Sequence, residues 1–293
     1  MKTCLIFYLM ILFQSNLRAQ NFTLEGVVKD SNNYLAFSSI EVLSKKKGII
    51  ADELGRFVIE INKTDTLLVK SLGFKSKYIS NFISDNIIIL LEPDTFLLNT
   101  VTVIPKNQEI IKKGYTGNKA KGGYRSKPGT IIAYLIQKDN VSNSEQILKD
   151  VSIFIANDEV VNTPIRIRCM SVSTNITQPD KDMYKESIIL KPNKGGKWYK
   201  IDLTNFNIKI PENGVFVCFE YFEDKPNYYT ENIMVKSDGS KVKYQSYGNT
   251  LGGYWSTEPN ITWHKTIGDK WFQRLEKINS EMMNVAVKYS IVY

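Results

Sequence analysis

The chain has 293 residues, of which 43% are hydrophobic and 12% are aromatic, enough to bury sizeable cores. Its length suggests two domains rather than one. The formal net charge is +8, and beyond the N-terminal segment no continuous apolar stretch approaches membrane-spanning length, so we expect no transmembrane segment in the mature chain.

The N-terminal segment has the pattern of a secretory signal peptide. Lys2 precedes an apolar run of about ten residues that ends at Phe13, and a small residue, Ala19, closes the segment. A helix that spans a bilayer needs about 20 apolar residues, so we predict that residues 1–19 are a cleaved export signal rather than an anchor. The mature protein is then expected in the periplasm, associated with the outer membrane, or at the cell surface.

Residues 20–104 alternate between apolar and polar side chains with the two-residue period of half-buried strands. The alternation is clear at 22–28, 40–42 and 57–61. Clusters of Gly, Asn and Asp recur about every eight to twelve residues, which is typical of a small β-sandwich. The run at 86–91 has no polar alternation, which predicts a strand buried on both faces.

Five motif blocks follow one another in this first segment. They are GVVKD at 26–30, LAFSSIEV at 35–42, GIIADELGRF at 48–57, DTLLVKSLGF at 65–74 and LNTVTV at 98–103. With these blocks, residues 20–104 resemble the carboxypeptidase regulatory-like (transthyretin-like) family, which is common in exported proteins of certain Gram-negative bacteria. The resemblance implies a seven-stranded β-sandwich.

The recognisable positions of this first domain have structural explanations. Gly55 and Gly73 suit a tight turn and a bend, and the Asp52 carboxylate can accept hydrogen bonds from its own turn. A zinc carboxypeptidase needs at least two histidines, whereas this chain has only His264, outside the first domain. The resemblance therefore implies no peptidase activity.

Residues 105–128 differ in composition from the segments on either side. They contain seven basic residues against one acidic residue, Glu109, together with four glycines. We predict a solvated, flexible connector. The alternative is a segment that grips a polyanion, which in an exported protein points to lipopolysaccharide phosphates or acidic glycans rather than nucleic acid.

Residues 129–293 again have a strand pattern and are predicted to form a larger, jelly-roll-like β-sandwich. Apolar runs occur at 130–136, 151–155, 165–169, 187–190, 215–219 and 285–292. At 165–169 arginines alternate with apolar residues, which predicts one core face and one solvated face. The blocks at 198–203, 208–211 and 214–220 resemble a jelly-roll-like domain that follows the regulatory-like domain in many proteins of the same bacteria; this resemblance implies an architecture and no activity.

The sequence offers little for catalysis. The lone His264 would have to serve as the base of any Ser-His-Asp or Cys-His arrangement, and no Gly-x-Ser-x-Gly motif is present. No metal-ligand spacing, phosphate loop or dinucleotide motif occurs, so no metal, cofactor or nucleic acid is implied. Cys169 and Cys218 lie in apolar runs; a disulfide between them and two free buried thiols are equally open.

A glycan-acting hydrolase is the alternative function. It would need a pair of carboxylates, and the acids near the characteristic blocks of the second domain are Asp202, Glu220, Glu223 and Asp224. Because the chain has 30 acidic residues, such a pair is weakly specified. We therefore expect a protein that is not an enzyme.

Aromatic residues near the C-terminus are the candidates for ligand binding. They are Tyr254, Trp255, Trp263 and Trp271. Tryptophan rings stack on the flat C–H faces of sugars, which favours a glycan platform, whereas burial of these rings in the second core is the competing interpretation. The sequence as a whole predicts an exported, non-catalytic cell-envelope module, binding or structural, that contacts a glycan or an envelope protein.

Overall fold

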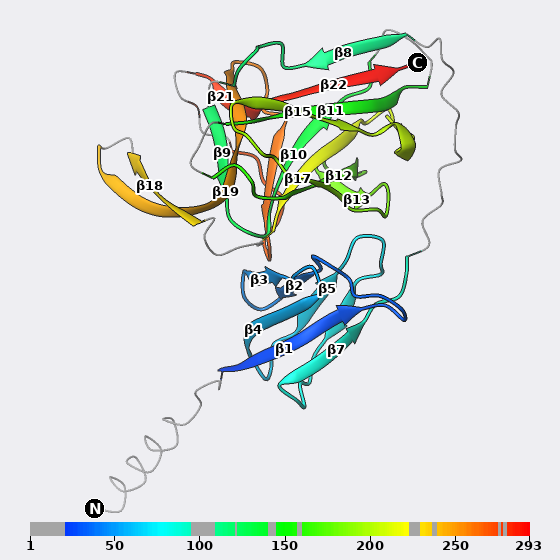
Figure 1. Ribbon diagram of the computed structural model, residues 1–293, viewed down its shortest axis with the longest axis vertical. Coiled ribbons are helices and arrows are strands. Elements are labelled where there is room, and N and C mark those ends of the chain that lie inside the picture. Colours follow the sequence, from blue (N-terminus) through cyan, green and yellow to red (C-terminus); the bar gives the residue numbers. More distant parts are fainter. Residues whose placement is uncertain are drawn as a thin grey trace, which may run out of the picture.

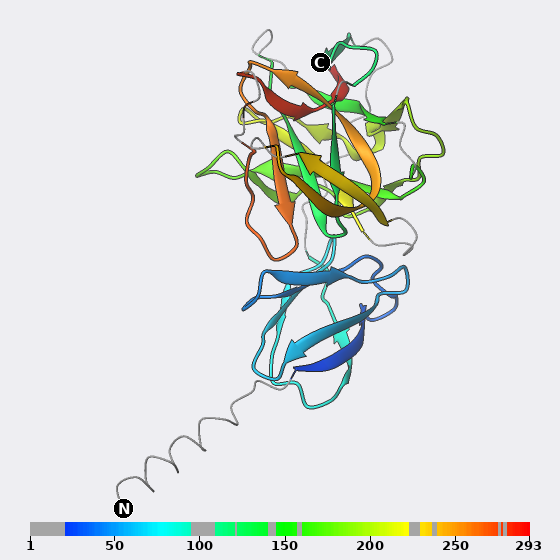
Figure 2. The same ribbon diagram turned by 90° about the vertical axis from the view of Figure 1, so that its left-hand side faces the viewer.

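The computed structural model describes residues 21–94, 109–120, 122–139, 145–156, 160–222, 229–235, 239–274, 277 and 280–293. These residues form an all-β protein with two β-sandwiches, seen one above the other in Figures 1 and 2, which confirms the predicted class. One short 3-10 helix, η1 (Thr204–Phe206), is the only helix in this described part. The predicted export signal, residues 1–19, lies outside it.

The first sandwich has seven strands. They are β1 (Asn21–Lys29), β2 (Ser39–Val42), β3 (Lys47–Ile50), β4 (Arg56–Asn62), β5 (Leu67–Lys70), β6 (Lys77–Ile79) and β7 (Asn86–Leu90). One sheet has the order β4-β1-β7, with β1 antiparallel to β4 and parallel to β7, and the other has the order β3-β2-β5-β6. Their inner faces enclose one apolar core, as the alternation at 57–61 predicts.

The predicted turn chemistry of this sandwich is confirmed. The carboxylate of Asp52 accepts hydrogen bonds from the backbone N–H groups of Leu54 and Arg56, both 2.8 Å long. Gly55 has a φ of +68°, and a Cβ there would lie 2.4 Å from the carbonyl oxygen of Val28. Only glycine fits this turn, which starts β4 beside β1.

Strand β7 differs from its prediction as a strand buried on both faces. Ile89 is buried, but Ile88 is 67% exposed and Leu90 is 49% exposed. The cause is that β7 lies at the edge of a sheet that is covered on one side only, so its side chains alternate between core and solvent. The last predicted motif, residues 98–103, lies outside the described residues.

The second sandwich contains the remaining strands. They are β8 (Ile110–Gly114), β9 (Gly122–Ser126), β10 (Thr130–Ile136), β11 (Ile147–Ile155), β12 (Ile165–Val172), β13 (Pro179–Asp182), β14 (Ile188–Leu190), β15 (Lys197–Asp202), β16 (Ile208–Lys209), β17 (Val215–Tyr221), β18 (Tyr229–Val235), β19 (Lys241–Ser256), β20 (Thr262–Thr266), β21 (Met282–Val285) and β22 (Val287–Val292). A six-stranded sheet has the path β13-β12-β17-β10-β20, with β14 paired to β12 off this path. A nine-stranded sheet has the path β18-β19-β11-β22-β8, with β15 and β16 paired to β11 and with β9 and β21 paired to β19 off this path.

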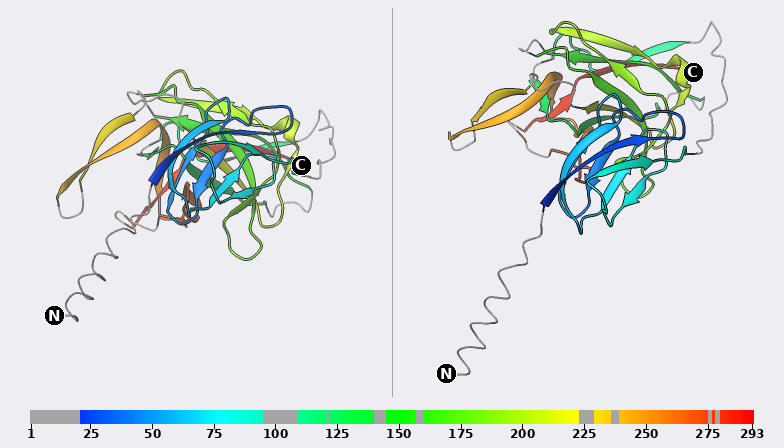
Figure 3. Two further views of the ribbon diagram at one scale, coloured as in Figure 1. Left: turned by 90° about the horizontal axis from the view of Figure 1, so that it is seen from below. Right: turned by 60° about the horizontal axis from the view of Figure 1, so that its bottom comes forward.

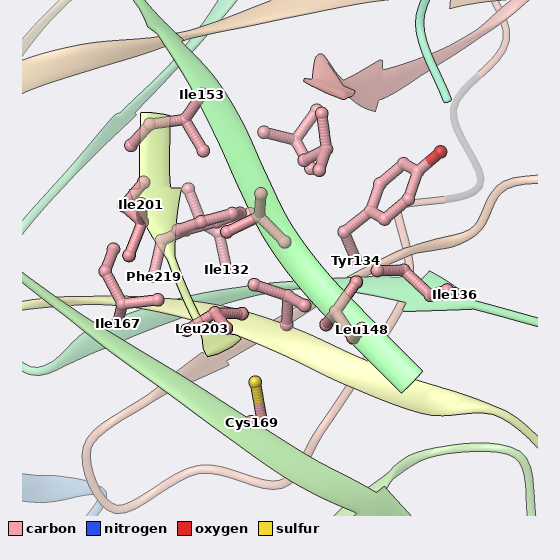
Figure 4. Close-up of a cluster of buried hydrophobic side chains, with 14 of the residues drawn as sticks. Ile132, Tyr134, Ile136, Leu148, Ile153, Ile167, Cys169, Ile201, Leu203 and Phe219 are labelled. Carbon is pink, nitrogen blue, oxygen red and sulfur yellow. The ribbon is translucent and has the colours of Figure 1, made fainter. Parts of the chain in front are cut away.

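The inner faces of these two sheets form the largest apolar cluster of the protein. Figure 4 shows side chains of this cluster, with Ile132, Ile153, Ile167, Ile201 and Phe219 from both sheets packed together. All five are buried. Successive side chains of β10, β12 and β17 point to opposite faces of the six-stranded sheet. The residues between these core positions therefore lie on its outer face, where several of them form a second apolar cluster.

The prediction of a flexible connector at 105–128 is wrong over most of the described part of this segment, which contains the two strands β8 and β9. β8 pairs with β22 at the edge of the nine-stranded sheet, and β9 pairs with β19. Gly122 and Gly123 face Gly253 and Gly252 in this pairing, and a Cβ at Gly123 would lie 2.3 Å from the side chain of Thr250. The glycines therefore permit a close approach of two strands instead of a loose backbone.

The strands β18 and β19 form a hairpin arm that extends away from the rest of the second sandwich, as Figures 1 and 3 show. Within the described residues no helix is both long and apolar enough to cross a membrane.

Candidate functional site

The outer face of the six-stranded sheet carries an ordered arrangement of polar and apolar residues. Residues directly opposite one another in antiparallel strands point to the same side, so the strand registers define rows across the sheet. One row runs Lys265, Ile131, Glu220, Arg166 across β20, β10, β17 and β12. The next two rows run Trp263, Ala133, Cys218, Arg168 and then Leu135, Phe216, Met170. The face is thus charged at one end and apolar at the other.

The charged end is a connected network of ion pairs. The Glu220 carboxylate lies 3.3 Å from Arg166 and 3.2 Å from Arg168. The Arg168 guanidinium also donates two hydrogen bonds, of 2.8 and 2.7 Å, to the two oxygens of Asp182. The Arg166 and Glu220 side chains are only 5% and 6% exposed. Burial of such charges is tolerated because each is paired and hydrogen-bonded.

The first sandwich covers this charged end. Arg166 donates a 2.9 Å hydrogen bond to the carbonyl oxygen of Phe37, and the Phe37 ring packs on Phe222 with a centroid distance of 4.0 Å. Arg166 lies 5.5 and 5.8 Å from the centroids of these two rings. The predicted solvated face at 165–169 is therefore wrong at Arg166, because another domain buries it.

Phe37 has an unusual backbone conformation for a bulky residue, with a φ of +55°. This left-handed conformation is a genuine outlier for a residue with a large side chain and persists only where surrounding contacts hold it. The contacts with Phe222 and Arg166 stabilise this backbone conformation. Two further ion pairs join the sandwiches at the periphery: Lys46 with Asp269, at 3.5 Å, and Lys191 with Glu53, at 3.7 Å.

Beside these contacts the two sandwiches leave a cleft of about 620 Å³. One wall is the outer face of β2 and β5 with the following loop at 71–76, and the other is the outer face of the six-stranded sheet. This volume lies within the range of small-molecule sites, and sites between domains are common.

Lys265 projects into this cleft without an ionic partner. It lines the same cleft as the Lys70–Glu41 pair, in which the charged atoms are 3.2 Å apart, and the Arg168–Glu220 pair. Among the described residues no carboxylate oxygen lies within 4 Å of its ammonium group, and this ammonium group donates no hydrogen bond. Burial, together with the neighbouring cations, lowers the pKa of Lys265 below its ordinary value.

An apolar patch lines the same cleft as Lys265. It consists of Ile131, Met170 and the half-buried Trp271, and Trp271 packs on the outer apolar cluster of the six-stranded sheet. An unpaired cation and an indole ring therefore line one cavity. This combination suits a ligand that has both an anionic group and a flat apolar face.

The four aromatic residues proposed for ligand binding do not form one platform. Tyr254, in β19, stacks on Tyr115, which directly follows β8 of the same nine-stranded sheet, at 4.9 Å between centroids, and Trp255 lies beside Gly122. Trp263 and Trp271 both pack on the outer apolar cluster. Of the four, Trp271 is the one that lines the cleft.

His264 is a packing residue in the structure. Its ring lies 5.0 Å from that of Tyr124 and 5.6 Å from that of Phe272, and its side chain is buried. Burial, with the Arg274 charge, lowers the pKa of His264 to about 3. The histidine points away from the cleft, because its neighbours Trp263 and Lys265 occupy the outer face of β20.

The two cysteines are buried and free. Cys169 belongs to the inner cluster of the sheet and Cys218 to the outer one, so their thiols point in opposite directions. Burial raises the pKa of Cys169 to about 12 and that of Cys218 well above its ordinary value. Neither thiol is a reactive nucleophile in this state.

Of the acids considered for a hydrolase, the two that the structure describes, Asp202 and Glu220, lie in different sheets. The Asp202 carboxylate lies in the nine-stranded sheet and accepts hydrogen bonds from Thr204, whereas Glu220 lies in the cleft. Glu223 and Asp224 lie outside the described residues. Within those residues no group of three or more His, Cys, Asp or Glu side chains is placed to hold a metal ion.

Sequence reasoning missed Arg166, Arg168 and Lys265 as members of a site. The alternation of β12 correctly separates its arginines from the core, and the alternation of β20 places Lys265 on the same side as Trp263. Both signals identify a face of a strand, but neither shows that the first sandwich covers this face and so forms a cleft.

Comparisons with known proteins do not identify a family. No protein-family model matches the chain, and no curated protein matches it.

Three solved structures illustrate the level of structural likeness. A DUF3823 family protein from Parabacteroides merdae is 9% identical, with 70% of this chain and 100% of that chain covered and a TM-score of 0.21. The cysteine protease and lectin-like domains of Cwp84, a surface layer associated protein of Clostridium difficile, are 11% identical, with 88% and 59% covered and a TM-score of 0.32. The Gx strain structure of infectious bursal disease virus is 6% identical, with 93% and 58% covered and a TM-score of 0.23. Likenesses at this level carry no functional information for this chain.

Proposed function

We propose that this protein is an exported, non-catalytic module of the cell envelope that binds a ligand in the cleft between its two sandwiches. The observation that carries the proposal is the cleft itself: it has the volume of a small-molecule site and contains a half-buried, unpaired cation beside an indole ring. The predicted export signal at residues 1–19 and the resemblance of the first sandwich to carboxypeptidase regulatory-like domains support a location in the envelope. The first sandwich then acts as one wall of the site.

A non-catalytic role is favoured by how the reactive groups are used. Glu41, Asp94 and Asp180 line the cleft, and Glu41 is paired with Lys70. The other two acids, Glu220 and Asp182, are bound to Arg168 at the cleft floor, where guanidinium groups take up their oxygens. A glycosidase needs one carboxyl group to give a proton and another to attack or activate water, so acids held in this way are poorly suited to hydrolysis. The buried His264 offers no substitute base.

A blocking variant tests the location of the site. Ser76 is exposed and lines the cleft, so Ser76→Trp fills the opening without changing a buried residue. Ser31→Trp is the matched control, since Ser31 is exposed on the same sandwich and does not line the cleft. The measurement is thermal shift against neutral polysaccharides (laminarin, xylan), acidic polysaccharides (polygalacturonate, alginate) and short peptides.

The proposal predicts that at least one compound raises the melting temperature of the wild type and of Ser31→Trp, but not that of Ser76→Trp. An equal response of Ser76→Trp would move binding elsewhere, and no response to any compound would contradict the binding role. Export is tested separately by N-terminal sequencing of the mature protein from the periplasmic and outer-membrane fractions, where a start at Gln20 is expected.

A further inference from the structure

The charges that line the cleft balance in number but are not all paired: the acids are Glu41, Asp94, Asp180, Asp182 and Glu220, and the bases are Lys70, Arg166, Arg168, Lys181 and Lys265. Lys70 is paired with Glu41, and Arg166 and Arg168 are paired with Glu220 and Asp182. Lys265 lines the same cleft and has no ionic partner among the described residues. A partly desolvated ammonium group gains most from a ligand that brings one negative charge to it.

The surroundings of Lys265 restrict what else that ligand can be. Lys265 and Ile131 are direct cross-strand neighbours, and Trp271 and Met170 lie in the same cavity. A pyranose ring has a flat C–H face of the kind that packs on an indole, while its hydroxyl groups can bind the polar wall formed by Ser39, Ser71 and Ser76.

We infer that the cleft binds a carboxylate-bearing sugar, with the carboxylate on the ammonium group of Lys265 and the sugar ring against Trp271. This inference rests on the proposed function and specifies the ligand of the same cleft. The paired acids at the floor do not compete for Lys265, because Arg166 and Arg168 already hold them. Because Glu41, Asp94 and Asp180 also line the cleft, they would repel a densely charged polyanion, which favours a ring with one carboxylate at Lys265.

The test is calorimetric titration of the full mature chain with trigalacturonic acid. Its trimethyl ester is the matched ligand, since it keeps the rings and hydroxyl groups and removes the charges. Lys265→Met removes the ammonium group at similar volume, Lys265→Arg retains the charge, and Lys63→Met is the control at an exposed lysine outside the cleft.

Trigalacturonic acid is expected to bind the wild type at least about tenfold more tightly than its ester, which corresponds to one charge-assisted hydrogen bond. Lys265→Met is expected to lose this preference, Lys265→Arg to retain most of it, and Lys63→Met to leave it unchanged. Equal binding of acid and ester, or unchanged binding of the acid by Lys265→Met, would overturn the inference. Tighter binding of trialanine, a peptide carboxylate, than of trigalacturonic acid would also overturn it.

The Ser76→Trp variant separates this inference from the proposed function. If Ser76→Trp abolishes binding of the ester or of trialanine while Lys265→Met leaves binding of the acid intact, the cleft is the site and the ligand class is wrong. If Ser76→Trp binds every compound as the wild type does, the cleft is not the site and both proposals fail.

Discussion

The two faces of the six-stranded sheet are built from the same strands but are buried in different ways. On the inner face, residues such as Ile167 and Phe219 pack against the other sheet of their own sandwich. On the outer face, Arg166 and Glu220 are also buried, and Arg166 is in contact with Phe37 of the first sandwich. Lys265 and Trp271, farther along that face, remain partly open. Burial within one sandwich gives stability, whereas incomplete burial between two sandwiches leaves a cleft.

The largest effect should come from the inner face. Phe219→Ala removes a fully buried ring from the main core, and we expect it to lower the free energy of unfolding by about 3–5 kcal/mol. Urea denaturation followed by far-ultraviolet circular dichroism measures this change. A loss below about 1 kcal/mol would mean that the two sheets do not pack as described.

On the outer face, Arg166→Met should have a smaller effect on stability and a larger one on domain arrangement. It removes the hydrogen bond to the Phe37 carbonyl and one partner of Glu220, while Arg168 remains. We expect a loss of about 2–3 kcal/mol, the usual contribution of hydrogen bonds to charged groups, and a larger radius of gyration in small-angle X-ray scattering. Arg56→Met, at an exposed site of the first sandwich, is the control and should change neither quantity.

Lowering the pH should reduce the free energy of unfolding through His264, which lies on the inner side of β20. Because the folded pKa of about 3 lies below the ordinary value of 6.5, the unfolded chain binds this proton first, and stability falls as the pH drops from about 6.5 towards 3. Between pH 7 and pH 5 the histidine should account for a loss of about 2 kcal/mol. His264→Gln should show a correspondingly flatter dependence in urea denaturation at the two pH values. If the free energy of unfolding of His264→Gln depended on pH as steeply as that of the wild type, the His264 ring would be solvated in the folded protein.

The smallest effect is expected at the rim of the domain contact. The Lys191–Glu53 pair joins exposed side chains at 3.7 Å, so Lys191→Ala should cost less than about 1 kcal/mol. The same denaturation experiment applies. A loss comparable with that of Arg166→Met would place the main domain contact at this rim instead of at Phe37.

The sequence predicts local structure well where a single sheet determines it. The strand at 130–136 coincides with β10, and the turn at Asp52 and Gly55 is formed as expected, because alternation and turn chemistry are local properties. The site could not be found in the same way. The cover over Arg166 and the unpaired state of Lys265 depend on residues more than 100 positions away, such as Phe37.

The prediction of a flexible connector at 105–128 is wrong because it relies on the glycine and lysine content of this segment. A Gly-rich basic stretch has the composition of a linker, but Gly123 is required by the close approach of Thr250, and the Lys113 ammonium group is paired with Asp139. These partners come from strands and loops that are distant in the sequence. Composition alone does not distinguish such an edge strand from a solvated connector.

Hydrogen–deuterium exchange with and without trigalacturonic acid tests the cleft most directly. We predict slower exchange in the loop at 71–76 and in β20, the two segments that face each other across the cavity. Protection confined to the β18–β19 hairpin arm, or no protection at saturating ligand, would contradict a binding site between the two sandwiches.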